Sequence, residues 1–583
     1  MSSRRRRLVP RNSRELLVVV MSLTASGLPL PSARADSGQS FWAAPSPSKE
    51  TDHPQVQAQV PVQAQVPIRA QEPVQASAQA MPRRTPVIRS ITITRANVFD
   101  RELADRDRRL LRWANSLHRR TSESVIRGRV LYREGEPLDT LRIIETERSL
   151  RALGIVGDVR TGLDYSPDSS EVAVTLHTAD QWSTFLRPIL ASSGGQSQAG
   201  IALEENNLLG TGNSVFLSYR AEAGERIASA SFWTPRFFHN RWTMGVDGSL
   251  RGANSRSFGI SLARPAWSLE DLHGFDTRLS TAREDYDYWS GGRELFTYTY
   301  RSHVAQAWYR RSLGRRLRPR LAVQVGSEES TVRVPAGWES FRDFLIPDEK
   351  SVWLTLTPSA GHYRYVRRRY LSNFGNVEDL TFGAWGYVSG TRTLDRGRTD
   401  RGRATLGLAL AGSWEWPAGL IGSADYDYSV RLEHGWRHSL HTATVRLLLH
   451  RPQRLVTILR LRPILVARPD PYRRTWLGGS RGLRGYETYA VAGQNTVLGN
   501  LEQRWFSPWS LLTVGFGASV FVDAALLWGE GPGITTKGWE GDVGGGLLLG
   551  MTRVPGFDVL RLDLAFPWDG GEPLLSFGTG VYF

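Results

Sequence analysis

The most restrictive feature of this chain is a long alternation of apolar with polar or small residues. From about residue 196 to the C-terminus the alternation recurs in stretches of about 8 to 14 residues, separated by breaks rich in Gly, Pro, Asn, Asp or Arg. A period of two places successive side chains on opposite faces of a strand, and no helical period competes with it. In the last stretch, for example, Leu575 and Phe577 share one face while Ser576 and Gly578 lie opposite. The sequence therefore predicts a mainly β protein.

Alternation alone fits both a soluble sandwich and a membrane barrel. A basic start typical of export, an aromatic last residue and about 385 residues without a change of pattern favour the barrel. In a closed barrel every backbone N–H and C=O group is hydrogen-bonded to a neighbouring strand, which is the condition for strands to span lipid. We expect a transmembrane antiparallel β-barrel over residues 196–583, and the breaks divide it into roughly 18 or 19 strands.

Composition excludes several other classes. The 583 residues include no Cys, which removes disulfides, thiolate metal sites and cysteine nucleophiles. No window offers the roughly 18 consecutive apolar residues of a membrane-spanning helix. The net charge of +16 comes from an excess of arginine, which is either surface charge or a means of meeting acidic lumen residues and lipopolysaccharide phosphates. Nucleic acid is not an expected partner of an exported barrel.

Two segments precede the folded part. Residues 1–35 combine a basic start, an apolar stretch at Leu16 to Leu23 and the small residues Ala33 to Ala35, the order of a secretory signal peptide. Residues 36–86 predict a disordered linker, because from about residue 43 the chain repeats Val-Gln-Ala-Gln-Val-Pro with minor variation and is poor in large apolar residues.

Residues 87–182 predict a small α+β domain. Val87 to Thr94 alternates like a strand, a helix-permissive segment follows at 101–119, and a second helix runs from the capping residue Asp139 to Gly154. Two more strands follow, giving the order strand, helix, helix, strand, strand. An exposed edge of such a sheet can accept an extended peptide as an added strand.

Four motifs together resemble the BamA/TamA superfamily of outer-membrane assembly factors and translocators. Glu204 to Gly212 is similar to the first hairpin of that superfamily, and Thr234 to Phe238 follows at a matching place. Gly478 to Tyr486 resembles its loop motif, and Phe521 to Ala525 resembles its Phe-x-Asp-x-Gly strand, with Ala525 in place of the glycine. The resemblance implies a barrel of about sixteen strands, which we adopt as the expectation, preceded by one POTRA domain, the periplasmic substrate-handling unit of these proteins.

The same resemblance implies that the loop folds into the lumen and that Arg484 meets an inward acidic residue there. Asp523 lies opposite the apolar positions Val520 and Val522, and Glu502 is a second candidate partner. From the residues alone, Arg484 also fits a solvated loop. The loop-motif residues expected to act are Gly479, Leu483, Arg484, Gly485 and Tyr486.

A weakly closed seam is expected between the first and last strands, near 200–208 and 574–583, because glycine in a strand costs stability. The terminal residues Gly578, Val581 and Phe583 resemble the insertion signal of outer-membrane barrels, and also fit a last strand that ends at the membrane interface. The expected seam residues are Gly200, Ile201, Leu203, Leu575, Phe577, Gly578 and Gly580.

No catalytic or metal set emerges from the sequence. His434, His438 and His441 sit close together, but Glu433 is the one carboxylate near them and a surface hairpin explains them as well. We therefore expect no enzyme, no cofactor and no metal.

The expected function is insertion or translocation of other polypeptides at the bacterial outer membrane. The partners would be unfolded outer-membrane or secreted polypeptides and outer-membrane lipids or lipopolysaccharide, with periplasmic chaperones or accessory lipoproteins left open. The alternatives are a dedicated secretion pore for one partner, a passive diffusion porin and a lipid-modifying barrel enzyme.

Overall fold

The computed structural model describes residues 85–98 and most of 118–579, with gaps at 152, 223, 239, 266–270, 291–292, 314–318, 370–373, 375–376, 396–401, 434, 452–453, 512–513, 530–533, 535–537 and 552–558. The predicted signal peptide, residues 36–84 of the predicted linker and residues 101–117 of the first predicted helix lie outside the described residues, and residues 118–119 are not helical. None of the helices in the described residues has the length and apolarity needed to cross a membrane.

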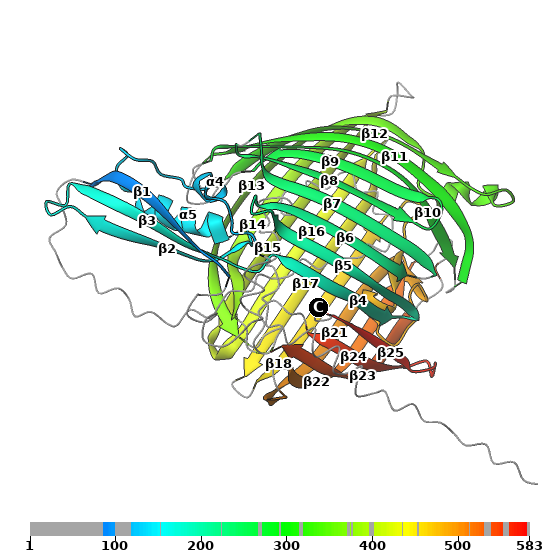
Figure 1. Ribbon diagram of the computed structural model, residues 1–583. Coiled ribbons are helices and arrows are strands. Elements are labelled where there is room, and N and C mark those ends of the chain that lie inside the picture. Colours follow the sequence, from blue (N-terminus) through cyan, green and yellow to red (C-terminus); the bar gives the residue numbers. More distant parts are fainter. Residues whose placement is uncertain are drawn as a thin grey trace, which may run out of the picture.

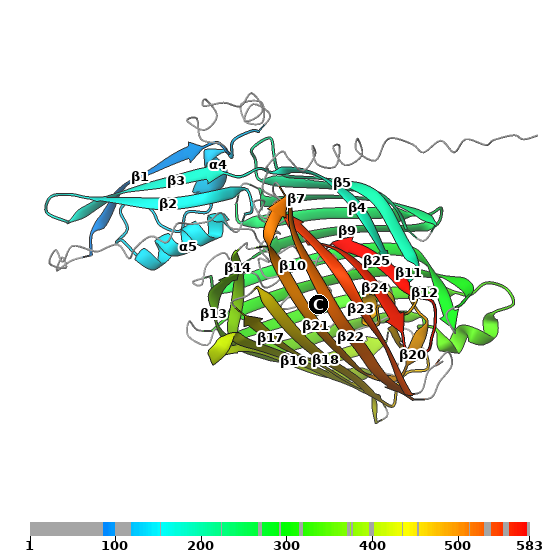
Figure 2. The same cartoon turned by 90° about the horizontal axis from the view of Figure 1, so that it is seen from below.

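The chain begins with a small α+β domain that lies at one end of the barrel (Figures 1 and 2). Its sheet has the order β1-β3-β2, with β1 parallel and β2 antiparallel to the central β3. The elements are β1 (Val87–Ala96), α4 (Glu123–Arg127), α5 (Thr140–Arg151), β2 (Val156–Tyr165) and β3 (Glu171–Asp180).

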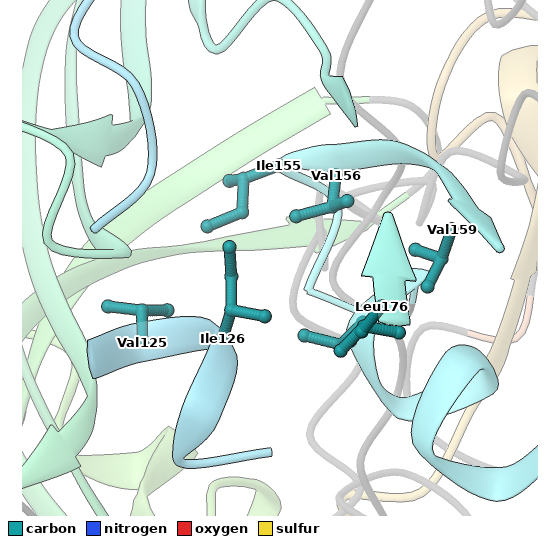
Figure 3. Close-up of a cluster of buried hydrophobic side chains, with 7 residues drawn as sticks. Val125, Ile126, Ile155, Val156, Val159 and Leu176 are labelled. Carbon is teal, nitrogen blue, oxygen red and sulfur yellow. The ribbon is translucent and has the colours of Figure 1, made fainter. Parts of the chain in front are cut away.

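Local sequence explains the elements of this domain. Asp139 accepts a hydrogen bond from the backbone N–H of Leu141 at the start of α5, and Gly154 takes the left-handed conformation (φ 70°) just beyond its end. The five-residue α4 was not predicted, because one turn is too short to show a helical period. Its Val125 and Ile126 point toward Ile155 and the sheet residues of a buried core (Figure 3).

The rest of the described chain forms one closed antiparallel barrel of 20 strands. The expectation of sixteen is wrong. Strands here run from 6 to 21 residues, so chain length does not fix their number. The first ten are β4 (Thr184–Ser193), β5 (Gln196–Leu208), β6 (Asn213–Glu222), β7 (Glu225–Phe237), β8 (Trp242–Arg251), β9 (Ser255–Arg264), β10 (His273–Ser290), β11 (Arg293–Ser312), β12 (Arg320–Arg333) and β13 (Glu349–Arg369). The others are β14 (Val377–Asp395), β15 (Arg403–Trp416), β16 (Leu420–Leu432), β17 (Trp436–Arg451), β18 (Leu455–Ala467), β21 (Asn495–Leu511), β22 (Val514–Trp528), β23 (Gly538–Met551), β24 (Leu560–Pro567) and β25 (Leu574–Thr579).

The barrel begins at Thr184 and not at residue 196. The first strand, β4, was missed because Pro188 and a run of small residues after it obscure the alternation. Proline cannot donate a ladder hydrogen bond and is confined to edge-like positions. Strand β4 is such a position, because in the part of the chain that the structure describes its pairing with β25 involves one residue on each strand.

The outward face of the barrel is apolar. On β10, β12 and β22, for example, Leu279, Val325 and Val520 are 54%, 51% and 63% exposed. The inward positions beside them are polar, and Ser519 and Asp523 are buried. A barrel with this distribution presents its apolar side chains to its surroundings and its polar side chains to the lumen, as a membrane barrel does.

The first hairpin motif docks the small domain onto the barrel. Within the turn from β5 to β6, the side-chain amide of Asn207 donates to Thr121 Oγ1 at 3.0 Å, and its oxygen accepts from the backbone N–H of Gly212. The backbone N–H of Ser122 donates to the carbonyl of Gly210 at 2.8 Å. Asn207 is 2% exposed, so these bonds lie in a closed contact between the two units.

Candidate functional site

The connection between β18 and β21 folds back into the barrel. It contains β19 (Thr475–Leu477), a 3-10 turn at Gly479–Arg481 and β20 (Val491–Gly493), and β19 pairs with β20. Its apolar residues pack on the inward faces of β21 and β22, in a cluster made of Leu477, Leu483, Tyr486, Val491, Leu498, Ala525 and Leu527.

Glycine is required where this loop approaches the wall. Gly482 has φ 126°, and a Cβ there would lie 2.3 Å from the side chain of Leu498. A Cβ on Gly485 would lie 2.7 Å from that of Asp542. The glycines of the motif therefore let the backbone reach the wall, which a bulkier residue would prevent.

Arg484 is the centre of the site. Its Nε donates to Asp523 Oδ2 at 2.7 Å and its Nη2 to Asp523 Oδ1 at 2.9 Å, while Nη1 donates to Glu502 Oε2 at 2.8 Å. The guanidinium carbon lies 3.3 Å from the ring centroid of Phe521. Arg484 is 1% exposed, so a bidentate, doubly paired guanidinium is held away from bulk water.

The network continues along the wall. Arg504 Nε donates to Glu502 Oε1 at 2.5 Å, and Arg561 Nη2 lies 2.8 Å from Asp563 Oδ2 and 3.4 Å from Glu502 Oε2. Asn500 donates to Asp523 Oδ1 at 2.8 Å. Each charged group therefore has a partner of opposite sign, the condition under which buried charges are tolerated.

A direct pairing of two carboxyl groups explains why the loop must supply cationic and N–H groups. Asp523 on β22 stands opposite Asp542 on β23, and like charges opposite one another destabilise a sheet. Arg484 binds Asp523, and the backbone N–H of Gly485 donates to Asp542 Oδ2 at 2.9 Å.

Tyr486 fixes the rim of the loop. Its hydroxyl donates to Glu540 Oε2 at 2.9 Å and lies 3.2 Å from the carbonyl oxygen of Gly541. Burial, together with the hydrogen bond to Glu540, raises the pKa of the Tyr486 phenol above its ordinary value. The phenol thus remains a hydrogen-bond donor at neutral pH.

The loop also reaches the other side of the barrel's closure. The backbone N–H of Thr488 donates to the carbonyl of Gly194, in the turn between β4 and β5, at 2.9 Å. Its hydroxyl lies 3.4 Å from the carbonyl oxygen of Ser193. One loop therefore contacts β21, β22 and β23 through residues 484–486 and the end of β4 through Thr488.

Within the described residues, which end at Thr579, β25 and β4 pair at one position, Phe577 with Ser192, whereas β4 and β5 pair over their whole length. A Cβ on Gly578 would lie 3.7 Å from that of Ala191, which is ordinary contact, so the glycine is not required by crowding. Of the last-strand residues predicted, Leu575, Phe577 and Gly578 lie on β25.

The predicted position of the other side of the seam is wrong. Gly200, Ile201 and Leu203 lie on β5, where each pairs with β4 on one side and β6 on the other. The cause is the missed first strand, which moves the seam by one strand. The remaining predicted terminal residues, Gly580, Val581 and Phe583, lie outside the described residues.

The two described histidines of the predicted group, His438 and His441, both lie on β17 and contact different partners. His438 Nδ1 lies 3.3 Å from Asp470 Oδ2, His441 Nδ1 lies 2.9 Å from the hydroxyl of Tyr426, and His434 falls outside the described residues. Within the part of the chain that the structure describes, no group of three His, Cys, Asp or Glu side chains suits a metal ion.

Several members of the network were not nominated from the sequence. Arg504, Arg561 and Asp563 alternate with apolar residues along their strands, which indicates an inward face, but nothing in one strand shows which strand it meets. Asp542 lies in a glycine-rich strand with little alternation to read. A charged residue on the polar face of a barrel strand was the available signal for the first three.

Comparison with known proteins gives structural relatives alone. No family model matches the chain, and no curated protein matches it. BamA from Haemophilus ducreyi lacking POTRA domains 1–3 is 14% identical, with 85% of this chain and 84% of that chain covered and a TM-score of 0.42. CdiB from Acinetobacter baumannii and CdiB from Escherichia coli are each 12% identical, cover 85% of this chain and 74% and 76% of their own, and have TM-scores of 0.44.

Proposed function

We propose that this protein passes other polypeptides into or across the bacterial outer membrane through the seam between β25 and β4. The observation that carries the proposal is that, among the residues described, β25 and β4 pair at one position, Phe577 with Ser192, while the other neighbouring strands of the barrel pair extensively. A short ladder has few hydrogen bonds to break, so this is the position at which the barrel opens at least cost.

The interior loop would keep the two sides of the seam aligned in both the open and the closed barrel. Arg484 fixes the loop to β22 and β21, and Thr488 fixes it to the end of β4. The arrangement supports a seam that parts along its length while the loop keeps the two sides in register.

The small domain, which we infer to be a POTRA domain in the periplasm, would deliver the substrate. In the described part of the chain, β2 pairs with β3 and its other edge has no strand beside it. An extended peptide adds to such an edge through main-chain hydrogen bonds. Neither step needs a nucleotide, a cofactor or a catalytic residue.

A disulfide across the seam tests the proposal. The chain has no Cys, so Ser192→Cys with Phe577→Cys introduces one unique pair. Oxidation should stop substrate passage in reconstituted membranes, and reduction should restore it. The matched control, Ser218→Cys with Ser229→Cys, joins β6 to β7 at a paired position away from the seam. Passage that continues through an oxidised seam would refute the proposal.

The substrate range remains the second question, and depletion of the protein answers it. Loss of many outer-membrane barrels would support general assembly, and loss of one exported protein would support a dedicated secretion pore. If the protein were a porin, its depletion would lower the permeability of the outer membrane to small solutes and would cause the loss of no other protein.

A further inference from the structure

The register of β9, β10 and β11 places three arginines in one row across the outside of the barrel. Arg283 on β10 stands directly opposite Arg256 on β9 and directly opposite Arg301 on β11. The three strands are neighbours in the barrel (Figure 1). They share the outward face with Ile260 and Leu279, which are 36% and 54% exposed.

Such a row is unfavourable on its own. Side chains directly opposite each other have Cβ atoms about 5 Å apart, and like charges there destabilise the sheet. Within the described residues, none of the three arginines makes an ion pair, and Arg283 Nε has no hydrogen-bond partner. The nearby outward acids are engaged elsewhere, since Thr299 donates to Asp285 at 2.7 Å and Lys350 lies 3.5 Å from Glu329.

The row lies at the edge of the apolar band. On β11 the next outward cation is Arg311, ten residues away, and His303, Ala305, Ala307 and Tyr309 lie between them. Ten residues span about 33 Å along a strand, which is about 25 Å along the membrane normal at a tilt of about 40°. Arg301 and Arg311 therefore mark the two polar boundaries of a lipid-facing band.

A cavity adjoins the row. It has a volume of about 570 Å³ and is lined by Arg301, Arg333, Arg342, Glu339, Thr299 and Thr331 among others. Arg342 is held by Asp348 at 2.9 Å, which leaves Arg301 and Arg333 as the cations on the strand side of the cavity.

We infer that this row and cavity bind the phosphate groups of an anionic lipid headgroup, specifically the diphosphorylated lipid A of lipopolysaccharide. Guanidinium groups bind phosphate in bidentate fashion, and a headgroup with two phosphates spans neighbouring arginines as a single anion does not. The turn after β5 contacts the small domain, and because successive strands alternate in direction, Arg256 at the start of β9 lies toward the opposite end of the barrel. The assignment to the outer leaflet therefore rests on the proposed periplasmic position of the small domain.

A lipid titration of the full chain in neutral detergent, followed by native mass spectrometry, tests the inference. The wild type should bind diphosphorylated lipid A saturably. Two arginines near a lipid surface contribute about fivefold each, so Arg256→Gln with Arg301→Gln should weaken binding roughly 25-fold. Arg264→Gln with Arg311→Gln is the matched control, because it removes the same charge from the same two strands at the opposite edge, and it should change binding less than about twofold.

Three outcomes would overturn the inference: no saturable binding by the wild type, equal weakening in both variants, or displacement of the lipid by millimolar inorganic phosphate. The last would assign a free-phosphate site. Retention of the compact band on an unheated gel shows that each variant is folded, and the two single variants replace the pair if it is not. The seam disulfide does not involve these arginines, so failure of either experiment is distinguishable from failure of the other.

Discussion

At the scale of single residues, Arg484 is the group whose loss should matter most. Arg484→Ala would leave Asp523 and Glu502 buried with reduced compensation, and breaking a buried pair costs about 3–5 kcal/mol. We expect Arg484→Ala to lower by several degrees the temperature at which the compact band is lost on a gel. Asp523→Asn should lower the same temperature. Arg484→Lys should recover only part of the lost stability. The lysine keeps the positive charge, but an ammonium cannot bond both carboxylates in the same planar geometry.

The matched residue-scale control is an exposed pair. Lys350 and Glu329 lie 3.5 Å apart, and both side chains are more than half exposed. Lys350→Ala should change stability by less than about 1 kcal/mol. Equal effects of Arg484→Ala and Lys350→Ala would contradict the buried ion-pair account.

At the scale of elements, the interior loop depends on its glycines. Gly482→Ala combines strain at φ 126° with a clash against Leu498, whereas Gly435→Ala has a similar strain at φ 113° and nothing within 4 Å of its Cβ. Strain alone is about 1–3 kcal/mol in either. We therefore predict that Gly482→Ala, and not Gly435→Ala, makes the loop susceptible to trypsin at its arginines. Equal resistance in both variants would show that the loop does not need its close approach to the wall.

The sequence predicts strands better than it predicts how they meet. Alternation put Glu502 and Asp523 on inward faces, and the structure brings both to Arg484, because parity along a strand is a local property. It failed at β4, where Pro188 and small residues hide the period, and that error moved the seam to the wrong strand. The facing pair Asp523 and Asp542 was invisible for a related reason, since register between strands depends on turns and neighbours and not on either strand alone.

At the scale of the whole molecule, the small domain and the barrel are held together by the turn after β5. Asn207→Ala removes the bonds to Thr121 and Gly212, and buried hydrogen-bonding groups left unsatisfied cost about 1–3 kcal/mol. The barrel should remain folded while the small domain gains freedom, which paired spin labels on the two units would report as a broader distance distribution. An unchanged distribution would mean that other contacts fix the domain.

The central claim is that the barrel turns its apolar face to lipid and its polar face inward. Single nitroxide labels along β10, from Thr277 to Ala282, test it in reconstituted membranes, because oxygen concentrates in lipid and nickel chelates in water. The structure predicts high oxygen accessibility at the outward positions 277, 279 and 281, and low oxygen accessibility at the positions between them. The claim would be contradicted if accessibility to the nickel chelate did not alternate along β10 and the protein stayed in solution without detergent.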